Sequence, residues 1–138
     1  MLALLSDINK VNKLEVANSA ATRQGSFVQA DGTAPVANTM SYAVWTEDAG
    51  ADSTWSPDVT ATGKLTVLLG GYRCKTDQFD SSETPAPGDP MIVHTDGKLK
   101  KASADHKSEI IVGYALEAKE TGYAYKGSTY TVLHVHII

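Results

Sequence analysis

Two histidines near the end of the chain have the spacing of a metal-binding pair. His134 and His136 are one residue apart, and alternate residues of a strand project from the same face. Imidazole is a common ligand of zinc, iron and copper, so three copies of the pair around a three-fold axis would offer six nitrogens to one ion. One chain supplies fewer ligands than a metal site needs. The alternative is an outer or subunit-facing strand face whose polar positions are histidine.

Cys74 is the one thiol in the sequence and the one candidate nucleophile. It alternates with Arg73 and Lys75, and neighbouring positive charges lower a thiol pKa. A lone cysteine on a strand is more typical of a small buried hydrophobe. The chain has neither of the glycine-rich phosphate loops, GxxxxGK[ST] and GxGxxG, nor calcium-loop spacing. The sequence therefore predicts a protein that is not an enzyme and needs no cofactor.

Composition predicts one globular domain and restricts its partners. The chain has 138 residues, 42% of them hydrophobic, and a net charge of -4. An acidic chain is a poor nucleic-acid binder, because phosphates are neutralised by clustered Lys and Arg. No apolar run reaches the roughly 18–20 residues of a membrane span, and the first residues lack the basic flank of a secretion signal. We expect synthesis in a cytoplasm and no nucleic-acid, membrane or small-molecule partner.

Short strands must position these side chains. Alternation and β-branched residues predict about seven of them, over residues 27–30, 41–46, 64–69, 72–76, 91–94, 110–116 and 130–138. Asp96-Gly97 predicts a hairpin with a type I′ turn, and Gly113 predicts a bulge or a close backbone approach. The predicted fold is all-β, a compact sandwich or small antiparallel barrel over residues 26–138.

Residues 1–25 are predicted to lie outside that domain, as an arm and linker. Apolar residues recur at steps of three, which favours a short amphipathic helix, whereas three asparagines disfavour one. The alternative is an extended arm that becomes ordered on a partner. In either form we expect the apolar side chains to dock on a neighbouring subunit: Leu2, Leu4, Leu5, Ile8 and Val11.

Two tryptophans are further candidates for interface anchors. Trp45 ends a predicted strand, and Trp55 lies in the long polar segment 47–62. Aromatic side chains dominate interface energetics, so both are expected at contacts with a partner or between subunits. The alternative for a tryptophan in a polar loop is that it folds back and caps the core.

Four features follow one another in the second half of the chain. They are Pro87-Gly88-Asp89-Pro90 before a strand, DGKLKKA at 96–102, IVGYALEA at 111–118, and a final strand. This succession, over residues 63–138, resembles the capsid decoration proteins of tailed bacteriophages, also called cement or head-stabilising proteins. The loop 47–62 and the N-terminal segment have no counterpart in that pattern.

The resemblance implies a β-barrel or β-tulip domain on the outside of an expanded icosahedral shell. It implies a homotrimer whose partner is the major capsid protein, located on the capsid exterior of the virion. The implied function is mechanical, because such proteins bridge neighbouring capsomers and resist the pressure of packaged DNA. The apolar N-terminal residues, Trp45 and Trp55 then become candidate shell or trimer contacts.

Two other classes of protein stay open. One is a tail spike tip or host-adhesion module, with His134 and His136 holding a metal on a trimer axis. The long repetitive β stem typical of such spikes is missing from the sequence. The other is a small enzyme or enzyme subunit that uses Cys74.

Overall fold

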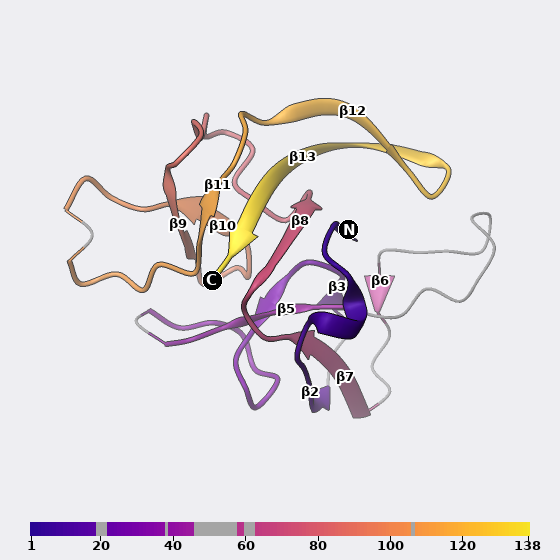
Figure 1. The fold of residues 1–138 in the computed structure, drawn as a ribbon. Helices are drawn as coiled ribbons and strands as arrows, with labels where there is room; N and C mark the ends of the chain where they lie inside the picture. The colour runs from indigo at the N-terminus through magenta and orange to yellow at the C-terminus, as the bar shows by residue number, and fades with distance from the viewer. Residues whose placement is uncertain (19–21, 38, 46–57, 60–62, 106) are drawn as a thin grey trace.

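Strands form nearly all of the regular structure (Figure 1). The computed structural model describes residues 1–18, 22–37, 39–45, 58–59, 63–105 and 107–138. One short 3-10 helix, η1 (Ile8–Lys10), accompanies the strands. The strands are β1 (Leu2–Leu4), β2 (Lys13–Asn18), β3 (Thr22–Arg23), β4 (Phe27–Val28), β5 (Tyr42–Val44), β6 (Asp58–Val59), β7 (Gly63–Leu68), β8 (Tyr72–Thr76), β9 (Pro90–Val93), β10 (Leu99–Lys101), β11 (Gly113–Ala115), β12 (Glu120–Tyr125) and β13 (Ser128–Ile137).

The strands pair into two main antiparallel sheets. The larger runs in the order β1-β8-β13-β11-β9-β10, with β12 paired to β13, and the smaller in the order β2-β7-β5-β4. A short ribbon joins β3 to β6. Figure 1 shows the smaller sheet below the larger one, with the β12–β13 hairpin arching over the top. Within the described residues the sheets stay open, so the sandwich prediction is confirmed and the closed barrel is not.

The main core lies between the two sheets. The inner face of β13 contributes Leu133, Val135 and Ile137, all at most 5% exposed, and they pack in one cluster with Phe27 and Leu68 of the smaller sheet. The predicted alternation of β13 is therefore confirmed, because the histidines lie on its other face. A second apolar cluster covers the opposite face of the smaller sheet.

The predicted boundary after residue 25 is wrong. β1 pairs with β8 and β2 pairs with β7, so the first 18 residues contribute to both sheets. Leu2 is 1% exposed and Val11 6%, and both belong to the main core. The helix prediction holds for one turn only, η1. Burial against the chain's own core gives these apolar side chains the partner that the sequence had suggested would be another subunit.

Two hairpins show how turn chemistry decides the register. The predicted 96–97 hairpin is confirmed, since β9 pairs with β10. Its type I′ turn is wrong: Gly97 has φ 81°, but Asp96 does not share the left-handed conformation. Lys126 and Gly127, between β12 and β13, both adopt the left-handed conformation, with φ 50° and 78°. The two-residue turn that the sequence analysis missed is therefore the one with I′ conformation.

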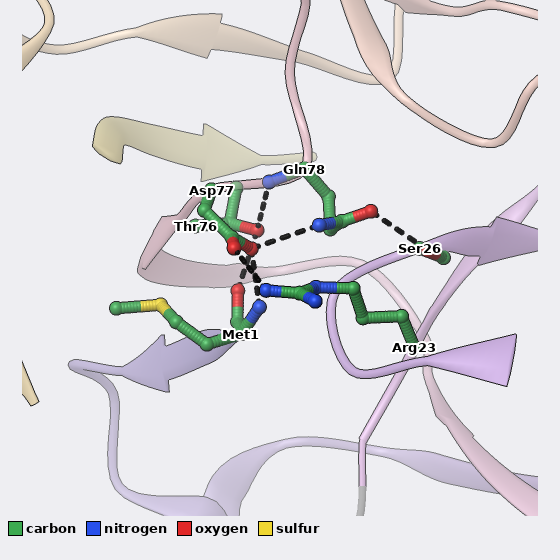
Figure 2. Close-up of polar contacts among 6 residues, drawn as sticks. All are labelled: Met1, Arg23, Ser26, Thr76, Asp77 and Gln78. Atoms are coloured by element: carbon green, nitrogen blue, oxygen red, sulfur yellow. Dashed lines mark hydrogen bonds and ion pairs between the residues drawn. The ribbon is translucent and has the colours of Figure 1, made fainter. Parts of the chain in front are cut away.

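A polar cluster fixes the start of the chain to the larger sheet (Figure 2). The Met1 ammonium pairs with Asp77 Oδ1, and Arg23 donates from Nη2 to Asp77 Oδ2 at 2.7 Å. Thr76 Oγ1 donates to the Met1 carbonyl at 2.8 Å. Gln78 Nε2 donates to Asp77 Oδ1 at 2.9 Å. Two cations and one amide thus converge on a single carboxylate, 14% exposed.

Acid should weaken this cluster. Burial alone would raise the pKa of Asp77, but hydrogen bonds from the Met1 ammonium, Gln78 and Arg23, together with the charge of that ammonium, hold the pKa below the usual value. A lowered carboxyl pKa stabilises the fold above the unfolded-state value of about 3.9, and the stabilisation disappears as pH falls through the folded-state pKa.

We predict that Asp77→Asn lowers stability by about 2 kcal/mol at pH 7 and flattens the loss of stability in acid. Urea unfolding between about pH 6 and pH 2 measures both effects. Asp105→Asn is the matched control, because Asp105 is an exposed aspartate outside the cluster. An Asp77→Asn protein with the wild-type pH profile would show that the cluster contributes nothing.

Candidate interaction surface

The outer face of the larger sheet carries a row of exposed and partly exposed side chains. We call Leu5, Arg73, His136 and Tyr114 the outer row. The register aligns Arg73 of β8 with His136 of β13, and His136 with Tyr114 of β11. The Leu5 amide donates to the Arg73 carbonyl at 2.9 Å, which extends the row past the end of β1. Residues aligned across strands have Cβ atoms about 5 Å apart, so the four side chains are neighbours.

The ends of the outer row are apolar and its middle is cationic. Leu5 is 44% exposed and Tyr114 41%, which places both among the exposed large hydrophobic residues. Arg73 is exposed, and no ion pair holds it among the residues that the structure describes. Of the two arginines in the sequence, Arg23 is the one bound to Asp77. The row therefore offers an unpaired guanidinium between apolar contacts.

The next row of the same face is covered by the chain itself. Ala3 aligns with Lys75, and Lys75 with His134. Lys75 Nζ lies 2.6 Å from Glu120 Oε2 and 4.6 Å from the centroid of the Tyr123 ring, and the hydrogen bond with Glu120 raises the pKa of Lys75. The hairpin tyrosines then cover Met1 and Val132. The β12–β13 hairpin thus covers this second row and does not cover the outer row.

The two histidines share a face, as predicted, but they do not share an open site. Both ring nitrogens of His134 are enclosed without a hydrogen-bond partner, and Nδ1 lies 3.2 Å from Glu117 Oε2, within ion-pairing distance. The cross-strand neighbours of His134 and His136 are the cations Lys75 and Arg73. No group of three or more His, Cys, Asp or Glu side chains in the described part of the chain is arranged to hold a metal ion.

Cys74 lies in the main core rather than at a site. It is 1% exposed, and burial raises the pKa of its thiol to about 12. The flanking cations Arg73 and Lys75 point to the opposite face of β8 and do not lower that pKa. The thiol is therefore protonated at neutral pH, so the structure offers no thiolate there for nucleophilic attack.

The predicted docking residues have different positions. Leu2 and Val11 are buried in the main core, and Leu4 and Ile8 pack against it, so four of the five predicted N-terminal residues contact their own chain. Leu5 alone of these five is an exposed large hydrophobic residue.

The two tryptophans that were predicted as interface anchors also differ from each other. Trp45 is half-buried against the main core, with Lys13 Nζ 5.7 Å from its ring centroid. Trp55 lies outside the described residues.

A groove lies near the other end of the larger sheet. Its volume is about 150 Å³, and it is bounded by residues 36, 37 and 39, by β9 and by residues 109–112. Val36, Ile92, Ile110 and Val112 supply an apolar lining, and Glu109 stands beside them. Sequence analysis missed the groove because its walls come from three separate parts of the chain.

Comparison with known proteins does not assign a family. No protein-family model matches the chain, and no curated protein matches its sequence. Among the described residues there is no helix long and apolar enough to cross a membrane.

Proposed function

We propose that this protein is a structural virion protein that binds the outer surface of an icosahedral phage capsid. As a homotrimer it would bridge capsomers of the major capsid protein and stabilise the expanded shell. The outer row carries this proposal: exposed Leu5 and Tyr114 flank the unpaired Arg73 on a sheet that is fixed by the core beneath it. Arginine and aromatic side chains are the types most enriched among residues that dominate interface energies.

The position of the resembling motifs supports the same function. The segments 87–90, 96–102 and 111–118 lead into or form β9, β10 and β11, and the final strand is β13. All four strands belong to the larger sheet, side by side. The features that resemble decoration proteins thus belong to one structural unit, and that unit includes the strands that carry His136 and Tyr114.

A rigid sheet surface suits a repeated weak contact. Side chains on paired strands lose less freedom on binding than a disordered arm would, which lowers the entropic cost of association. Many copies on one shell, each trimer with several contacts, then add avidity. Shell binding through the outer row therefore replaces the predicted docking by an N-terminal arm.

Binding of purified protein to expanded shells that lack it tests the role of the outer row. We expect Tyr114→Ala to weaken binding about 30-fold, the effect of losing an anchor worth about 2 kcal/mol. Leu14→Ala is the matched control, because Leu14 is 39% exposed on the smaller sheet. Equal shell affinity of both variants would contradict the role of the outer row.

The number of copies in purified particles distinguishes decoration from the alternatives. About one copy per major capsid protein supports shell decoration. A few copies per particle would favour a tail spike tip or adhesion module, and bound metal lost on His136→Ala would then be sought. Absence from particles would overturn the virion proposal.

A further inference from the structure

We infer that His134 and Glu117 form a proton-operated clasp. The clasp holds the connection between β11 and β12 against β13 while the imidazole is charged, and releases it when the imidazole is neutral. The inference goes beyond the proposed function and does not rest on it.

The His134 ring is enclosed without the hydrogen bonds that an imidazole needs. Its side chain is 17% exposed, and neither ring nitrogen has a hydrogen-bond partner among the residues that the structure describes. A neutral imidazole has one donor nitrogen and one acceptor nitrogen. Each costs free energy when it is buried without a partner. Such a group in a folded protein calls for a physical reason.

A carboxylate beside the ring supplies that reason. Glu117 Oε2 lies 3.2 Å from His134 Nδ1. The distance suits an ion pair, but the two groups are not aligned as a hydrogen bond. Coulomb attraction needs no such alignment, and it acts only while the imidazole carries a charge. The contact therefore stabilises the imidazolium form and does little for the neutral ring.

The other charges facing His134 leave one carboxylate in excess. Lys75, the cross-strand neighbour of His134 on β8, lies 2.6 Å from Glu120 Oε2 and 4.6 Å from the centroid of the Tyr123 ring. The hydrogen bond with Glu120 raises the pKa of Lys75, and the charge of Glu117 adds to the same effect. One lysine thus stands among two carboxylates. A proton on His134 balances the second carboxylate.

The remaining titratable groups on this face lie farther along the strands or are already paired. His136, two residues along β13, has Arg73 and Tyr114 as its cross-strand neighbours. Arg73 opposes a further positive charge on this face, but it is aligned with His136. The Met1 ammonium, at the start of β1, is paired with Asp77. Protonation of His136 in the same pH range requires a control.

The clasp acts on a short connection that is fixed at both ends. Residues 116–119 lead from β11 into β12, whose hairpin with β13 arches over the larger sheet (Figure 1). The Leu116 amide donates to the His134 carbonyl at 2.8 Å, and Lys119 Nζ donates to the Ser81 carbonyl at 2.7 Å. Glu117 lies between these two contacts. Loss of its attraction to His134 leaves the Leu116 hydrogen bond to open more often.

The direction of the pH effect follows from the two side chains. An ordinary imidazole is mostly protonated at pH 5.5 and mostly neutral at pH 8, whereas an ordinary glutamate is ionised at both. The clasp is therefore closed at pH 5.5, and its stabilisation disappears as pH rises to 8. Asp77 does not contribute in this range, because its pKa is held below the usual aspartate value.

Hydrogen exchange of the Leu116 amide tests the clasp. We propose to measure it by NMR on the purified full chain at pH 5.5 and pH 8, corrected for the intrinsic pH dependence of exchange. We expect the protection factor to fall about 5-fold at pH 8, the effect of a partly exposed ion pair at the upper end of its usual range. The Leu99 amide, which donates to the Gln78 carbonyl, should keep its protection. Glu117→Gln should remove the difference, because it retains the size of the side chain and loses the charge.

Two histidine variants provide the controls. His136→Gln changes the same face of the same strand, and His94→Gln removes a 50% exposed imidazole that lies 3.3 Å from Asp96. Both should keep the pH response, whereas His134→Gln should abolish it. Thermal unfolding establishes that each variant is folded. If His134→Gln does not fold, Glu117→Gln against His136→Gln still decides the question.

A titration observes the pair directly. The carboxyl carbon signal of Glu117 should show a second inflection at the pH where the His134 ring signals reach their midpoint. Equal Leu116 protection at both pH values, a response retained in Glu117→Gln, or a missing second inflection would overturn the inference. None of these measurements involves shells, so failure of the clasp would leave the proposed function standing.

Discussion

Removal of residues 1–16 is expected to leave a chain that does not fold. The deletion takes away β1, which pairs with β8, and most of β2, which pairs with the full length of β7. It also removes Met1, Leu2, Val11 and Val16, each at most 6% exposed. At about 2–5 kcal/mol each, the loss of four buried apolar side chains is comparable to the whole stability of a typical domain, about 5–15 kcal/mol. Circular dichroism and thermal unfolding of the truncated protein measure the effect.

A single substitution isolates the contribution of β1. We expect Leu2→Ala to destabilise the protein by about 2–5 kcal/mol, because it empties a site that is 1% exposed in the main core. Leu14→Ala, at 39% exposure in the same N-terminal segment, should cost less than about 1 kcal/mol. A truncated chain that melts cooperatively near the wild-type temperature would restore the view of an independent arm.

Gly113→Ala is expected to have the next largest effect. A Cβ at residue 113 would lie 2.2 Å from the carbonyl oxygen of His136, on the paired strand β13. Backbone cannot yield as a flexible side chain does, so β11 and β13 must move apart. We expect a loss of about 3 kcal/mol, at the upper end of the cost of overpacking, with weakened pairing at the centre of the larger sheet.

Gly71→Ala provides the control for this prediction. Gly71 has φ 88°, and a Cβ there would meet nothing within 4 Å. The substitution carries only the cost of a left-handed backbone, about 1–2 kcal/mol. Urea unfolding of both variants separates steric contact from backbone conformation. Equal losses would show that the close approach of Gly113 to β13 does not matter.

Alternation of apolar residues predicted most of the larger sheet. The strands that bury one face, such as β8 and β13, have a clear period of two, and the structure confirms them. β12 was missed because most of its residues are exposed and Gly122 interrupts it. β1 and β2 were interpreted as an arm or a helix because their apolar residues recur at steps of three. In the structure that spacing runs through two strands separated by the single turn η1. Pairing with distant strands determines the structure of these segments, and their local sequence does not reveal that pairing.

The outer row was beyond sequence analysis for a different reason. The face of each strand was predictable, since His136 alternates with core residues of β13 and Arg73 alternates with Cys74. The row exists only because β8, β13 and β11 are neighbours in a particular register. That register depends on contacts between distant segments, which one sequence does not reveal. Leu5 was predicted as a docking residue, but for an arm that the fold does not have.

Because buried and outward-facing residues alternate along these strands, selection for folding and selection for binding act on different positions of this chain. Along β8, β11 and β13, each outer-row residue stands between two buried neighbours, such as Cys74 or Val135. The core neighbours fix the backbone, whereas the outer-row side chains bear little of the folding free energy. A change of partner could therefore proceed by substitution at alternate positions of three strands. Descendants of this chain would then diverge at every second residue while the sheet that carries them stayed the same.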